Sequence, residues 1–110
     1  MNLSEEMHAE TTVMAVAGRL DGATAMSFEE AMSKAVAASG HGIVLDLAHV
    51  HYISSAGLRA ILVVAKLLQA RQTPFAICEL SPEVREVFAI SGFDRVLRVA
   101  GTRAEALAGV

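Results

Sequence analysis

The sequence predicts an α/β fold in which helices cover a mostly parallel sheet. Two observations support this prediction. Short apolar runs alternate with segments whose apolar residues recur at helical spacing, and the residues between them are of the turn or cap type. Along the 110 residues a strand followed by a helix occurs four times, an order that implies parallel strands joined by right-handed crossovers.

The first 42 residues predict two strands and a helix. We expect the first dozen residues to add an antiparallel edge strand. Residues 12–20 are apolar on both alternating faces, as in a central strand. Asp21-Gly22 marks a turn. The helix that follows begins near Thr24 and is expected to end at Ser39-Gly40-His41-Gly42, because glycine is the usual left-handed cap.

The middle of the chain predicts two buried strands around a strongly apolar helix. Residues 43–47 form a short continuous apolar run, typical of a strand buried on both faces. The helix over 56–71 has an apolar stripe widened by neighbouring valines and leucines, so we expect it to be covered on more than one side. Thr73-Pro74 ends this segment, and 75–80 forms the next strand.

The last third of the chain carries the clearest helix signals. Ser81-Pro82-Glu83 combines a serine cap, proline at the first helical position and an acid in the first turn, and Gly92 ends this helix. Residues 96–100 predict a last strand. Thr102 and Glu105 form a capping box for a terminal helix. We therefore expect about four helices, packed mainly on one face of the sheet.

Composition excludes several classes of protein. Hydrophobic residues make up 54% of the chain, which excludes disorder, and one cysteine excludes an intramolecular disulfide framework. A net charge of −3 argues against nucleic acid or anionic lipid as the main partner, and no apolar run is long enough for a membrane span. We expect one soluble cytoplasmic domain over residues 1–110, monomeric, with no membrane partner.

Two adjacent hydroxyls at the start of the helix over 56–71 are the candidate site. The ordinary role of Ser54 is a helix cap, whose oxygen would accept from an amide near Gly57. Ser55 would then occupy the first helical position with its hydroxyl free, where a phosphoryl group would meet unpaired N–H donors and the positive end of the helix dipole. Gly57 permits close approach either of another backbone or of a partner.

These residues resemble a known family. The stretch IVLDLAHVHYISSAGLRAIL (43–62) and the turn GRLD (18–21) resemble STAS-domain proteins, specifically the bacterial anti-sigma factor antagonists. The resemblance implies a single STAS domain that binds a serine-kinase anti-sigma factor when unmodified and releases it when phosphorylated. A serine/threonine phosphatase would reverse the modification. The acceptor carries over to Ser55, with Ser54 as second choice, because many members have aspartate where this chain has Ser54.

The docking face implied by the resemblance surrounds the acceptor. A phosphoryl charge on this small, mostly apolar face would oppose a partner's carboxylates and weaken binding without a change of fold. The residues assigned to it are Asp21, Ser54, Ser55, Gly57, Leu58 and Arg59.

Other functions remain as alternatives. An accessory subunit of a transporter ATPase would share the fold and much of the motif but would not be phosphorylated. Ser55, His51 and Asp46 include the residue types of a hydrolytic triad at the wrong spacing. His49 and His51 could bind a metal with Asp46, but such histidines are usually polar loop residues. We expect no catalytic residue, metal or cofactor, and we expect Cys78 to be a buried small hydrophobe.

Overall fold

The computed structural model describes residues 1–38 and 41–110, so the expected helix end at Ser39 and Gly40 lies outside the described residues. The chain order of the elements is β1 (Asn2–His8), β2 (Thr11–Leu20), α1 (Ala25–Ala38), β3 (Gly42–Ile53), α2 (Ser55–Ala70), β4 (Phe75–Cys78), α3 (Pro82–Ser91), α4 (Phe93–Val96), β5 (Val99–Ala100) and α5 (Arg103–Gly109). No helix within the described ranges combines the length and apolar character needed to cross a bilayer.

The strands form one five-stranded sheet in the order β1-β2-β3-β4-β5. β1 is antiparallel to β2, and the other three neighbouring pairs are parallel. The predicted α/β fold with a mostly parallel sheet and an antiparallel edge strand is therefore confirmed. Because β2 and β3 are parallel neighbours, their carboxyl ends meet, and Leu20 pairs with Ile53.

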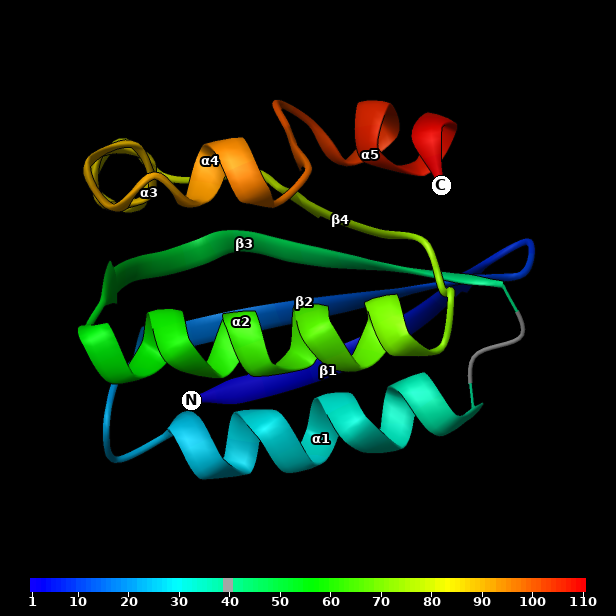
Figure 1. Ribbon diagram of the computed structural model, residues 1–110, viewed down its shortest axis with the longest axis horizontal. Helices are drawn as coiled ribbons and strands as arrows, with labels where there is room; N and C mark the ends of the chain where they lie inside the picture. The colour runs from blue at the N-terminus through cyan, green and yellow to red at the C-terminus, as the bar shows by residue number, and fades with distance from the viewer. Residues whose placement is uncertain (39–40) are drawn as a thin grey trace.

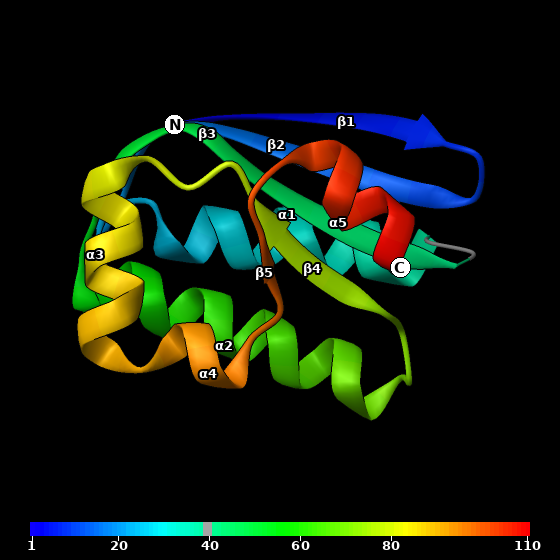
Figure 2. The ribbon, with the colours of Figure 1, turned by 90° about the horizontal axis from the view of Figure 1, so that it is seen from above.

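Helices cover both faces of the sheet (Figures 1 and 2). α1 and α2 lie side by side on one face, and the main core lies between them and the sheet. Val84 and Phe88 of α3 join that same core. α5 covers the opposite face, where Ala106 packs with residues such as Val44 and Cys78 in a second, smaller cluster.

Local capping follows the sequence prediction. Ser81 accepts a hydrogen bond from the backbone N–H of Val84 at 3.3 Å, and Gly92 ends α3 with a left-handed φ of 78°. Thr102 accepts from the N–H of Glu105 at 3.1 Å at the start of α5. Each bond joins residues at most three positions apart, so sequence spacing was sufficient to predict it.

Three elements differ from the expectation. β3 continues past residue 47 to Ile53, because its pairing with β2 resumes beyond an irregularity in the register. Residues 93–96 form α4, a fifth helix where a strand was expected to begin at Val96, and the N–H of Leu97 donates back to the Phe93 carbonyl at 2.8 Å. β4 ends at Cys78, because Glu79 takes a left-handed φ of 60°.

Candidate functional site

The candidate site lies where β2 and β3 end and α2 begins. The backbone N–H of Ser54 donates to the Leu20 carbonyl at 3.0 Å, which joins the start of α2 to the end of β2. The turn after β2 is close by, because a Cβ added to Gly22 would lie 3.9 Å from the Cβ of Ala56. Two strand ends, a turn and a helix start therefore meet at one place.

The two serines have different surroundings. Ser54 has extended backbone angles, and its side-chain oxygen accepts from the Gly57 N–H at 3.2 Å, so its predicted role as helix cap is confirmed. Ser55 is the first residue of α2 and is exposed. Its hydroxyl makes no hydrogen bond to any part of residues 1–38 and 41–110. The cap therefore uses one hydroxyl and leaves the other in solvent.

Gly57 is buried and brings the helix against the sheet. A Cβ at this position would overlap the Leu20 carbonyl oxygen and would lie 2.9 Å from Cγ1 of Ile53. Of the two roles open for this glycine, close approach of another backbone within the chain is the one that the contacts show. Gly57 therefore sets the position of α2 and is not itself on the surface.

Asp21 organises the turn between β2 and α1. Its carboxylate accepts from the N–H of Ala23 at 3.0 Å and from Nε of Arg19 at 3.3 Å. Partial desolvation alone would raise the pKa of Asp21, but these hydrogen bonds outweigh it and hold the pKa below its ordinary value. The N–H of Asp21 also donates to Oγ1 of Thr24 at 3.0 Å. The carboxylate thus stabilises the turn beside the start of α2.

The remaining predicted residues lie along the first turns of α2. Leu58 is half-buried and packs against the main core, whereas Arg59 is exposed and joins no ion pair within the described chain. Met26, in the first turn of α1, has 74% of its surface exposed, and α1 and α2 begin at the same end of the sheet (Figure 1).

Sequence analysis missed two residues near the strand ends. The Arg19 guanidinium lies 4.0 Å from the centre of the Tyr52 ring, and the two residues pair across β2 and β3. The apolar run at 43–47 predicts a strand that ends before Tyr52, so no sequence signal places Tyr52 beside Arg19. Recognising that β3 continues to Ile53 would have brought the two together.

Comparison with known proteins then decides the family. The model of the STAS domain matches residues 2–106. The chain belongs to the STAS domain family. The resemblance found in the motif at 43–62 is thereby confirmed.

Several relatives of this STAS domain are named anti-sigma factor antagonists, and one solved neighbour is named as a sulfate transporter family protein. BtrV of Bordetella bronchiseptica, whose name places it provisionally among the anti-sigma factor antagonists, is 45% identical over 91 residues, which cover 83% of this chain and 78% of BtrV. The crystal structure of an anti-sigma factor antagonist from Mycobacterium paratuberculosis matches with a TM-score of 0.91 and 28% identity, covering 99% of this chain and 92% of the other.

A second solved relative is SpoIIAA of Bacillus, described as an anti-sigma factor antagonist. Its unphosphorylated form matches with a TM-score of 0.78 and 25% identity, covering 99% of this chain and 98% of that one. Its phosphorylated form matches with a TM-score of 0.71 and the same identity, covering 97% of each chain. Both forms share the fold of this chain.

Asp46 and the two nearby histidines lie in different surroundings in this STAS domain, and His49 is exposed. Asp46 accepts from Nε of Arg103 at 2.8 Å on the face covered by α5, and its other oxygen accepts from the N–H of Ala48. His51 lies 3.9 Å from the carboxylate of Glu83, and its side chain is mostly exposed. Within the described ranges no three His, Cys, Asp or Glu side chains are grouped to hold a metal ion.

Proposed function

We propose that this STAS domain is an anti-sigma factor antagonist that binds a serine-kinase anti-sigma factor and loses that binding when Ser55 is phosphorylated. The proposal rests on the different roles of the two adjacent serines, Ser54 and Ser55. Ser54 caps α2, and Ser55 presents an exposed hydroxyl at its first position. The names of the relatives support the partner class, and the two forms of SpoIIAA support phosphorylation as the switch.

The start of α2 suits a phosphoryl group. A phosphate on Ser55 would meet the unpaired N–H groups of the first turn and the positive end of the helix dipole. Since the cap hydrogen bond belongs to Ser54, modification of Ser55 leaves it in place. Phosphorylation therefore changes the charge of the surface and not the fold.

The charge of a phosphorylated Ser55 also disfavours binding of the partner. A phosphoserine adds about −1.5 to −2 charges, and a like charge opposed across an interface costs several kcal/mol. Such a cost corresponds to a loss of about a hundredfold or more in affinity. In this proposal the docking surface comprises Ser54, Ser55, Leu58 and Arg59 beside the Asp21 turn, and a serine/threonine phosphatase restores the unmodified form. One domain, a monomer and a cytoplasmic location stay predictions.

Phosphorylation by the cognate kinase tests the proposal. After incubation with kinase and ATP, the wild type and Ser54→Ala should both gain the mass of one phosphate, whereas Ser55→Ala should gain none. In titration calorimetry, Ser55→Asp should bind the kinase about a hundredfold more weakly than wild type, and Ser55→Ala should bind like the unmodified protein.

Two outcomes of these experiments would contradict the proposed function. Equal affinities of Ser55→Asp, Ser55→Ala and wild type would show that charge at this position does not control binding. No mass gain in any variant would favour the alternative, an accessory subunit that is never phosphorylated.

A further inference from the structure

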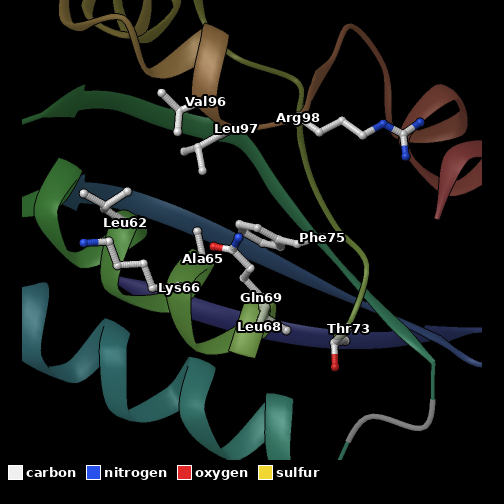
Figure 3. Close-up of a pocket in the computed structure, with 10 residues that line it drawn as sticks. All are labelled: Leu62, Ala65, Lys66, Leu68, Gln69, Thr73, Phe75, Val96, Leu97 and Arg98. Carbon is white, nitrogen blue, oxygen red and sulfur yellow. The ribbon is translucent and has the colours of Figure 1, made fainter. Parts of the chain in front are cut away.

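A groove lies between α2 and the edge of the sheet, away from Ser55. Its volume is about 440 Å³, which is in the range of ligand-binding sites. We call it the edge groove, and its lining includes Leu62, Ala65 and Lys66 of α2, Phe75 of β4, and Val96 and Leu97 at the end of α4 (Figure 3). Apolar side chains form most of its wall, so an occupant must present apolar groups.

The backbone beside the edge groove offers an open strand edge. β5 pairs with β4 only at Ile77 and Cys78, and the N–H of Ile77 donates to the Arg98 carbonyl at 2.9 Å. Backbone groups of alternate residues point to the same side of a strand, so those of Phe75 also face the β5 side. In the described chain β5 does not reach back to Phe75. One N–H and one C=O therefore border the groove without a neighbouring strand.

The electrostatics of the edge groove favour an anion. Lys66 and Arg98 line it, and among the described residues no carboxylate does. The Arg98 side chain is directed away toward α5, where it donates to the Gly109 carbonyl (Figure 3). Lys66 is exposed and forms no ion pair with any described residue. An acidic group entering beside Lys66 would gain a partner without displacing one.

We propose that the edge groove binds an extended peptide segment of a protein partner, with apolar residues next to an acidic one, by strand addition to β4. The added segment would exchange backbone hydrogen bonds with Phe75 in line with β5, as other proteins bind peptides at open sheet edges. Every second side chain would point toward α2 and fill the space between Ala65 and Leu97, and a carboxylate would reach Lys66.

This site is distinct from the proposed phosphorylation site. Lys66 follows Ser55 by eleven residues on one helix, which is roughly 16 Å along the helix axis. The two ends of α2 can therefore bind different molecules, and a variant at one end leaves the other intact.

The test is an NMR titration of the ¹⁵N-labelled full chain with the blocked peptide acetyl-Glu-Val-Leu-Val-Glu-amide. We expect shift changes at the amides of Phe75 and Leu97, and at saturation we expect hydrogen exchange at the Phe75 amide to slow at least tenfold. The same peptide with lysine in place of both glutamates should bind at least tenfold more weakly. Octanoate is the second probe, since a fatty-acid pocket would bind it without protecting the Phe75 amide.

Variants inside and outside the edge groove test whether the peptide binds there. Val96→Glu and Lys66→Glu should each weaken peptide binding about tenfold, whereas Ile90→Glu, at a similarly exposed apolar position on α3, should not. Ser55→Asp should bind the peptide like wild type, which separates this proposal from the phosphorylation switch. The proposal is overturned if no binding occurs up to about 5 mM peptide, if the lysine peptide binds equally well, or if Phe75 exchange is unchanged when peptide or octanoate binds.

Discussion

Replacement of Gly57 by alanine tests how tightly α2 is seated on the end of β2. The added Cβ would overlap the Leu20 carbonyl oxygen and approach Cγ1 of Ile53 to 2.9 Å. Neither neighbour can move easily, because one is backbone and the other belongs to a side chain buried in the main core. The helix start must therefore shift away from the strand.

The expected change in unfolding free energy has three contributions, of which two destabilise the variant and one stabilises it. Overpacking of this kind costs about 1–3 kcal/mol. A shift of α2 also weakens the hydrogen bond from Ser54 N–H to the Leu20 carbonyl, and such bonds contribute about 0.5–1.5 kcal/mol. Alanine regains about 0.5–1 kcal/mol over glycine inside a helix. The sum is a loss of about 0.5–4 kcal/mol of unfolding free energy, or roughly 2–16 °C in Tm.

Urea unfolding followed by far-UV circular dichroism measures this loss. Gly22→Ala is the matched control, because a Cβ there meets only Ala56 at an ordinary 3.9 Å, and its stability should stay within about 0.5 kcal/mol of wild type. If Gly57→Ala were as stable as wild type, the backbone contact would not be the reason for this glycine. Such a result would favour the other role considered for Gly57, which is contact with a partner.

Three further predictions concern the cap of α2, the ion pair of Glu6 with Arg103 and the burial of Cys78. Ser54→Ala should lower the unfolding free energy by about 1 kcal/mol in urea titrations through loss of its cap, while Ser55→Ala should change it by less than about 0.5 kcal/mol; equal losses would contradict the division of roles. Hydrogen bonding to His8 and then the charge of Arg103 lower the pKa of Glu6, so the stability from this carboxylate is complete above its unfolded-state pKa and is lost as pH falls through its folded pKa. Stability measured between about pH 5 and pH 3 should therefore fall less steeply in Arg103→Gln, and parallel slopes would refute this coupling. Burial raises the pKa of the Cys78 thiol to about 12, so a disulfide reagent at about pH 8 should label it only in urea, and rapid labelling of the folded protein would contradict its burial.

Much of the candidate site could be predicted because it is built from neighbours in the chain. The hydrogen bond from Gly57 to Ser54 spans three residues, and so do the caps at Ser81 and Thr102. A serine before an apolar periodic run identifies such a cap without knowledge of the rest of the fold. The exposure of Ser55 followed from the same argument, since one cap needs only one hydroxyl.

Contacts between distant residues could not be predicted in this way. Arg19 and Tyr52 meet because β3 continues alongside β2, and the apolar run at 43–47 carries no sign of that continuation. Val96 reads as part of an apolar strand, yet 74% of its surface is exposed at the end of α4. Hydrophobicity of a short run does not report whether a neighbouring strand is within reach.

The sequence by itself determined the order of strands and helices apart from α4, the caps at Ser54, Ser81, Gly92 and Thr102, and the STAS motif with its paired serines. Only the tertiary structure decided that Gly57 lies against Leu20, that Arg103 pairs with Asp46 on the second face of the sheet, and that β5 leaves part of β4 uncovered. The physical reason is the separation along the chain of the residues that interact. Caps and turns are set by hydrogen bonds between residues a few positions apart, whereas these three features depend on how segments far apart in the chain pack together.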